Sequence, residues 1–166
     1  MLNVNFVYDN ISVNSVEEKD MEKVGIWLFK KNDTNNKIFN LKEFNDRFLE
    51  YYISESEFFL KVEINNKIIG IIKGRIEYKN ENQIWFWYFN IEEKSLSSLL
   101  LKKTIEFFKN EFSIDDFYAI ADEKSELMKF YEENKFKLSR VSKNFFKSEN
   151  DNMDMFILKL SKLTMG

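Results

Sequence analysis

The chain has 166 residues, of which 44% are hydrophobic and 32% charged, and its formal net charge is −3 at pH 7. This composition is typical of a folded globular protein, and we expect a single domain spanning residues 1–166. The small negative charge argues against a dedicated nucleic-acid binder. With no histidine and no cysteine, the chain has no disulfides, no Ser-His or Cys-His catalytic groups and no zinc site built on these residues, and we expect no metal.

Membrane insertion and secretion are not expected either. No apolar run approaches the ~20 residues that a membrane span needs. The start, MLNVNFVYDN, has no basic segment followed by an apolar stretch, so it does not resemble a signal peptide. We therefore expect a cytoplasmic protein without a membrane partner.

The first half of the chain predicts one strand, two helices and three further strands. Alternation predicts a strand at 11–16, and apolar residues at helical spacing predict a helix from Glu17 to the polar segment 32–36. A second helix is expected at 41–52. The period then changes to two over 58–64 and 68–78, which are joined by Asn65-Asn66 in a hairpin turn. The segment 84–91, IWFWYFNI, is almost wholly apolar and predicts a central strand.

The second half predicts a helix, a strand, a helix and two strands. The expected ranges are 95–110, 116–121, 124–134, 136–146 and 153–160, with a polar hairpin turn at 148–154. No repeat or linker divides the chain. This order predicts an α/β or α+β architecture with a crossover helix between the strands 84–91 and 116–121.

Three segments carry a resemblance to a known family. The hairpin FLKVEINNKIIGIIKGRIE has Gly70 after its turn, FNIEEKSLSSLLLKKTIEFF joins a strand to a helix, and ADEKSELMKFYEENKFKL ends in Tyr131 to Phe136. In this order they resemble the second and third strands, the pyrophosphate loop and the Tyr-Glu-Lys-x-Gly-Phe helix end of the GNAT superfamily of acetyl-CoA-dependent N-acetyltransferases. The resemblance implies a central mixed, twisted sheet of about seven strands flanked by about four helices.

The middle segment departs from the family pattern Arg/Gln-x-x-Gly-x-Gly/Ala. Glu92 stands at the basic or amide position, and Ser95 and Ser97 stand at the two small positions. Lys135 likewise replaces the glycine before Phe136. The acids at 92–93 repel an anionic cofactor, whereas the serine hydroxyls offer hydrogen bonds to phosphate.

The resemblance implies that acetyl-CoA is the co-substrate and places its site. The pantetheine arm is expected along Phe89, Asn90 and Ile91. The pyrophosphate is expected at the start of the next helix, where unpartnered N–H groups and the helix dipole favour an anion. The expected contacts there are Lys94, Ser95, Leu96, Ser97 and Ser98. The alternative for Ser95 is an ordinary helix N-cap.

The catalytic groups are less determined. By the resemblance, Tyr131 is the acid that protonates the departing thiolate; the alternative is a core tyrosine beside Leu127 and Met128. Trp85 and Trp87 share a strand face and either wall an acceptor site or belong to the core. The general base is open among four acids: Glu57, Glu63, Glu92 and Glu93.

We therefore predict an acetyltransferase that transfers acetyl from acetyl-CoA to a primary amine by direct attack, without an acyl-enzyme. The alternative is a catalytically inactive GNAT-like binding or interaction module, which the altered loop favours. The acceptor, a small-molecule or peptide amine, is left open among a small amine, an aminoglycoside, an amino acid and a protein N-terminus. The oligomeric state is also left open, with a homodimer possible.

Overall fold

A computed structural model of the chain describes residues 1–30, 41–78, 80–122, 126–147 and 152–160. The strands are β1 (Asn5–Tyr8), β2 (Ile11–Ser15), β3 (Glu57–Ile64), β4 (Lys67–Tyr78), β5 (Asn82–Ile91), β6 (Asp116–Asp122), β7 (Phe136–Lys147) and β8 (Asn152–Leu160). The helices are the short η1 (Glu18–Asp20), α1 (Met21–Lys30), α2 (Leu41–Ile53), α3 (Lys94–Glu111) and α4 (Glu126–Glu133). The predicted polar break at 32–36 and residues 148–151 of the predicted turn lie outside the described residues.

The strands form one sheet in the order β1-β2-β3-β4-β5-β6-β8-β7. The β5–β6 pair is parallel and the other neighbouring pairs are antiparallel, with α3 as the crossover between β5 and β6. The predicted mixed α/β architecture is confirmed. The sheet has eight strands rather than about seven, because β1 escapes the sequence analysis: most of its side chains are exposed, so no burial alternation marks it.

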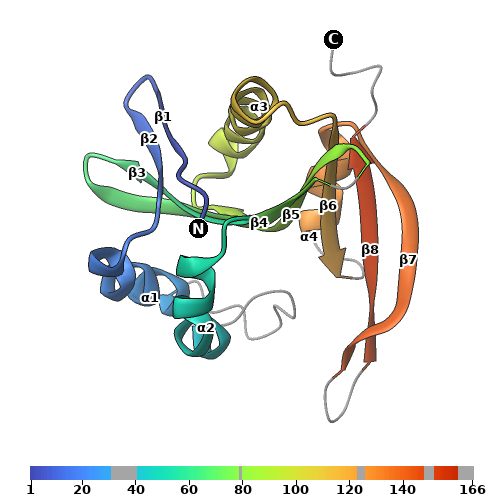
Figure 1. The fold of residues 1–166 in the computed structure, drawn as a ribbon, viewed down its shortest axis with the longest axis horizontal. Coiled ribbons are helices and arrows are strands. Elements are labelled where there is room, and N and C mark those ends of the chain that lie inside the picture. The colour runs from blue at the N-terminus through green and yellow to red at the C-terminus, as the bar shows by residue number, and fades with distance from the viewer. Residues whose placement is uncertain (31–40, 79, 123–125, 148–151, 161–166) are drawn as a thin grey trace.

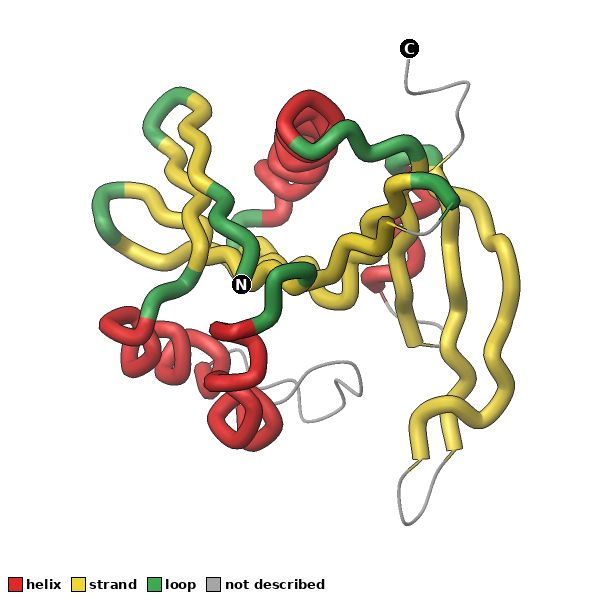
Figure 2. Tube along the Cα trace, viewed as in Figure 1, coloured by secondary structure: helices red, strands yellow, loops and turns green. Residues whose placement is uncertain are grey.

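Helices cover both faces of the sheet. Figure 1 shows α3 above the central strands and α1 with α2 below them, and Figure 2 shows the same layers as a tube. The larger core lies on the α3 side, where Phe58, Phe86 and Phe108 are fully buried and α4 contributes Tyr131. A second core lies on the α1–α2 side around Trp27 and Tyr51. Among the helices that the structure describes, none combines the length and apolar character that a bilayer crossing needs.

A buried ionic cluster ties the start of α1 to β3. Lys61 Nζ lies 2.9 Å from Asp20 Oδ1 and 3.1 Å from Glu63 Oε1. Glu63 also lies 3.7 Å from the ammonium of Lys23, and the Glu17 N–H donates to Asp20 Oδ2 at 3.0 Å. Because Asp20 and Glu63 are both buried, the cluster compensates charges that would be unfavourable alone.

Candidate active site

The parallel ladder between β5 and β6 is short. It runs from Gln83↔Asp116 to Phe86↔Ala119, whereas β5 continues to Ile91 and β6 to Asp122. In the described part of the chain, no further residue pair joins these two strands. The expected pantetheine edge, Phe89 to Ile91, lies on this continuation of β5. Its backbone groups that face the β6 side are therefore available to a ligand.

A β-bulge lies where the two strands part. Lys73 pairs with Tyr88 and Gly74 with Phe86, so Trp87 is the extra residue of β5. A Cβ atom on Gly74 would collide with the Trp85 carbonyl and the Phe58 ring, so glycine is needed for this close approach. The bulge turns Trp87 and Tyr88 to the α1–α2 face: Lys73 lies over the Trp87 ring, and Tyr88 belongs to the second core.

The start of α3 lies directly beyond β5. The helix begins at Lys94, and its N-cap residue is Glu93, whose side chain makes no cap hydrogen bond. Ser95 is therefore not the N-cap, and that alternative is wrong. The Ser95 hydroxyl instead donates to Glu93 Oε1 at 3.2 Å. Because the Glu93 side chain makes no hydrogen bond to the first N–H groups of α3, this helix start keeps a favourable environment for an anion.

The remaining predicted contacts differ in exposure. Lys94, Ser95 and Ser98 are exposed, Leu96 is half-buried and Ser97 is buried. The Ser97 side chain thus lies on the core side of α3, away from solvent.

The end of α4 lies beside the first turns of α3. The Asn134 amide donates to the Ser98 hydroxyl at 3.1 Å and to the Phe130 carbonyl at 2.8 Å. Lys135, at the family's glycine position, has φ 73°, a left-handed conformation that glycine adopts more easily. The backbone here keeps the shape expected of the pattern although the residue differs.

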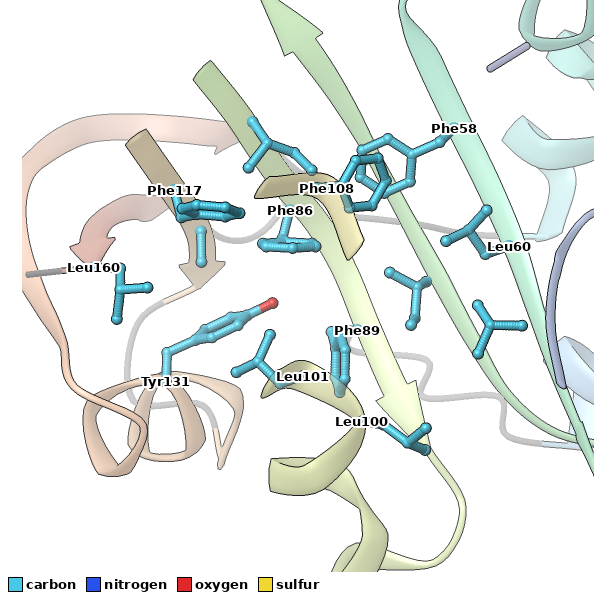
Figure 3. Close-up of a cluster of buried hydrophobic side chains, with 14 of the residues drawn as sticks. Phe58, Leu60, Phe86, Phe89, Leu100, Leu101, Phe108, Phe117, Tyr131 and Leu160 are labelled. Carbon is cyan, nitrogen blue, oxygen red and sulfur yellow. The ribbon is translucent and has the colours of Figure 1, made fainter. Parts of the chain in front are cut away.

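Tyr131 is fully buried on α4, and its ring packs between Phe130 and Phe136. Figure 3 shows its hydroxyl directed toward Phe86 and Phe89 of β5, the segment where the β5–β6 ladder ends. Within the described residues this buried hydroxyl has no hydrogen-bond partner. Burial raises the pKa of the Tyr131 phenol well above its ordinary value, so the group stays protonated at neutral pH. Tyr131 is thus a core residue that also presents an unused donor.

The four candidate bases lie in different parts of the fold. Glu63 is held by Lys61 and Lys23 in the ionic cluster. Glu92 and Glu93 are exposed at the start of α3, and Glu57 begins β3. None of the four is distinguished as a base by these contacts.

The two tryptophans line the opposite face of β5 from Tyr131. Trp85 stacks on Tyr118 with a centroid distance of 4.5 Å, and both rings are half-buried. Trp87 lies beside Lys73, which is only 5% exposed and also lies over the Tyr51 ring. The sequence analysis missed Lys73, although a lysine inside the apolar run IIGIIKGRIE is a recognisable signal of a buried charge.

Several features of this region could hold an extended ligand that carries a pyrophosphate. Within the described ranges, no group of three or more His, Asp, Glu or Cys residues could hold a metal ion. The Tyr131 hydroxyl, which has no partner in the described part of the chain, lies beside β5, and β5 ends at Ile91 shortly before α3 begins at Lys94. The exposed acids Glu92 and Glu93, by contrast, repel an anionic ligand at the start of α3.

Comparisons with known proteins bear on the fold and the family. Residues 13–157 match the family described as Acetyltransferase (GNAT) domain. No curated protein matches the sequence.

Among solved structures, the apo ribosomal L7/L12 alpha-N-protein acetyltransferase RimL superposes with a TM-score of 0.79 at 12% identity, covering 96% of this chain and 94% of that chain. Spermidine N-acetyltransferase from Vibrio cholerae, in complex with CoA and spermine, superposes with a TM-score of 0.70 at 16% identity, covering 91% and 95%. A GNAT-family acetyltransferase from Streptococcus pneumoniae gives 0.65 at 14% identity, covering 90% and 98%.

Proposed function

Because the chain belongs to the GNAT acetyltransferase family, we propose that it transfers the acetyl group of acetyl-CoA directly to a primary amine. The observation that carries this proposal is the buried hydroxyl of Tyr131, which has no hydrogen-bond partner among the described residues and is directed at the part of β5 where β6 leaves it. A buried donor without an acceptor is unfavourable, and such a group is often retained for function. We propose residues 1–166 as one catalytic domain.

Tyr131 holds a proton beside the leaving sulfur. When bound, acetyl-CoA supplies an activated thioester carbonyl. Because burial raises the pKa of Tyr131, its phenol is a weak acid but a constant hydrogen-bond donor. It stabilises negative charge as that charge develops on sulfur, and a thiol of ordinary pKa ~8.5 is already a fair leaving group.

Binding and orientation are assigned to β5 and α3. The backbone of Phe89, Asn90 and Ile91 offers strand hydrogen bonds to an extended pantetheine arm, as a further strand would. The N–H groups of the first turn of α3 hold the pyrophosphate. Lys94 and the exposed hydroxyls of Ser95 and Ser98 add donors at the same place, while Leu96 and Ser97 contribute backbone.

The acceptor is a small-molecule or peptide amine. Structural neighbours act on each kind: RimL is a ribosomal-protein N-acetyltransferase and the Vibrio cholerae enzyme a spermidine N-acetyltransferase. An alkylamine of pKa ~10.4 must lose a proton before it attacks, which costs about 4–5 kcal/mol at neutral pH. We assign that proton to water, since the contacts of the described acids single out none of them as a base.

The test separates cofactor binding from chemistry. Acetyl-CoA affinity is measured by calorimetry, and release of free thiol is measured with a panel of amines. We expect Tyr131→Phe to keep the affinity and to lose about tenfold or more in kcat, as removal of one acid or transition-state donor does. Tyr78→Phe, at an exposed tyrosine, is the matched control. Unchanged turnover in Tyr131→Phe contradicts the role of Tyr131.

The helix-start site has its own test. Ser95→Glu places a negative charge in the first turn of α3 and should weaken acetyl-CoA binding by about tenfold, whereas Ser139→Glu on exposed β7 should not. Tight binding without thiol release from any amine would instead support the inactive binding module, which the glycine-free loop with Glu93 as N-cap favours.

A further inference from the structure

The strand β7 forms one edge of the sheet, and Figure 1 shows it as the outermost strand on its side of the molecule. Among the described strands, β8 is the one that pairs with it. Within the described ranges, no backbone hydrogen bond from another segment reaches residues 136–143 from outside the sheet. The outward N–H and C=O groups of these residues are therefore a template for one further strand.

Basic side chains follow this edge. The sequence from 134 to 147 contains five basic residues and no acid, although the whole chain has a net charge of −3. Lys143 is exposed and lies 3.7 Å from Asp154. The side chains of Lys135, Lys137 and Arg140 are also exposed, and they have no ion-pair or hydrogen-bond partner among the described residues. The edge thus presents positive charge that no neighbouring acid neutralises.

An irregularity in the pairing of β7 with β8 places two of these charges on one face. Lys137 pairs with Lys159 and Arg140 with Ile157, so Ser139 is the extra residue of a β-bulge. Lys159 and Ile157 are two positions apart on β8 and therefore share a face of the sheet. Since directly paired residues lie on the same face, Lys137 and Arg140 also share it.

These charges decide what can pair with the edge. If a second copy of the chain added its β7 to this one, Lys137 and Arg140 would lie beside the same cations of the other copy. Like charges opposite each other on neighbouring strands are destabilising, and lysines and bulges on an edge are a common protection against such pairing. An acidic strand would be attracted by the same charges. Its carboxylates would lie opposite the two cations, and an apolar residue between them would cover Leu138, which is 48% exposed.

A nucleic acid matches the edge less well than a peptide does. A peptide backbone supplies both the donors and the acceptors that an open strand edge needs. Single-stranded nucleic acids instead bind where bases stack on exposed aromatic rings, and residues 136–143 present no exposed aromatic ring.

We propose that the β7 edge, residues 136–143, binds an extended acidic segment of a partner protein as an additional strand. Lys137 and Arg140 select the partner by charge, and Leu138 packs against an apolar residue between its acids. The inference goes beyond acetyl transfer and does not depend on it, because β6 and β8 separate β7 from β5.

The experiment uses a short fluorescein-labelled peptide of alternating glutamate and valine. Its binding to the full chain is followed by fluorescence anisotropy in the absence of acetyl-CoA. One comparison peptide alternates lysine and valine, and another has the glutamate–valine sequence with methyl groups on its backbone nitrogens, so it keeps its charge but cannot donate strand hydrogen bonds. We expect the glutamate–valine peptide to bind at least about tenfold more tightly than either, and to weaken about tenfold between about 0.05 and about 0.5 M salt.

Charge reversal assigns the binding to β7. Lys137→Glu combined with Arg140→Glu should weaken binding of the acidic peptide at least about tenfold and should favour the lysine–valine peptide instead. Lys30→Glu combined with Lys67→Glu changes the net charge by the same amount at exposed lysines elsewhere, and it should leave the affinity unchanged. Amide hydrogen exchange over residues 136–143 should slow when the wild type binds the acidic peptide.

Three results would overturn the proposal. Equal binding of the methylated peptide would show that charge alone attracts the acidic peptide, without an added strand. Tighter binding of single-stranded oligodeoxythymidylate than of the acidic peptide would assign the basic strip to a nucleic acid. A wild-type dimer in analytical ultracentrifugation that the Lys137→Glu, Arg140→Glu variant does not form would assign the edge to a second copy of the chain.

Discussion

Replacing Tyr131 by phenylalanine should stabilise the protein in the absence of acetyl-CoA. The residue is fully buried, and its hydroxyl has no partner among the described residues. An unsatisfied buried donor costs about 1–3 kcal/mol, and Tyr131→Phe removes it. The ring contacts with Phe130 and Phe136, at centroid distances of 5.5 and 5.3 Å, are retained. We therefore expect the free energy of unfolding to rise by about 1 kcal/mol or more, which is a Tm increase of roughly 2–4 °C.

The assay is urea unfolding of both proteins, first alone and then with saturating acetyl-CoA. Saturating acetyl-CoA should stabilise both proteins by the same amount, because Tyr131→Phe is expected to keep the acetyl-CoA affinity. The exposed Tyr78 provides the control, since Tyr78→Phe should change stability by no more than about 0.5 kcal/mol. A loss of about 1 kcal/mol in Tyr131→Phe would refute the reasoning, because it would show that the hydroxyl has a partner in the free protein.

The same burial predicts the effect of alkaline pH. Since the folded protein holds the pKa of Tyr131 above the unfolded value, ionisation of this phenol does not lower the free energy of unfolding of the wild type below about pH 10. The free energy of unfolding should fall progressively as the pH rises above that value, because the unfolded chain then releases the proton more easily than the folded protein. Tyr131→Phe should lose less stability over this range.

The remaining predictions concern the sheet and are measured by urea unfolding. Gly74→Ala should destabilise the protein by about 1–3 kcal/mol, because the new Cβ meets the Trp85 carbonyl. Gly70→Ala should cost less, because its nearest obstacle is the end of the Ile91 side chain. Equal losses of stability in the two variants would contradict the bulge geometry. Asp20→Asn should cost about 1–3 kcal/mol by weakening the contact with Lys61. Burial alone raises the pKa of Asp20, but the Glu17 N–H and Lys61 outweigh it and hold the pKa below its ordinary value. The free energy of unfolding of the wild type should therefore exceed that of Asp20→Asn by the full amount above about pH 4, and the difference should disappear as the pH falls further. A difference that persists in acid would show that the Asp20 carboxylate contributes nothing to it.

Much of the element order could be predicted because periodicity reports burial. The helix from Ser95 and the strand IWFWYFNI are each within two residues of α3 and β5, since their apolar side chains repeat with a clear period. The hairpin at Asn65-Asn66 is also confirmed, and both asparagines have positive φ. The strand β1 was missed because it is held by backbone bonds to β2 rather than by buried side chains.

The site depends on features that single-residue patterns do not encode. The bulge at Trp87 changes which side chains share a face, and it is visible only once β4 and β5 are paired. The Tyr131 hydroxyl lies beside β5, which is distant from it in sequence. Lys73 is covered by Tyr51 of α2, which is also distant in sequence. The N-cap of α3 is Glu93 rather than Ser95, because helix boundaries depend on backbone geometry that composition predicts to within a residue or two.

The position of β8 has a consequence for how the molecule is made. The last described strand lies between β6 and β7, and β7 joins the sheet only through it. During synthesis, β7 cannot join the sheet, and the edge of β6 that pairs with β8 stays unpaired, until residues 152–160 have been made. Phe136 and Leu160, which pair across β7 and β8, belong to the same core as Tyr131. The core around Tyr131 is therefore complete only once residues 152–160 have joined the sheet.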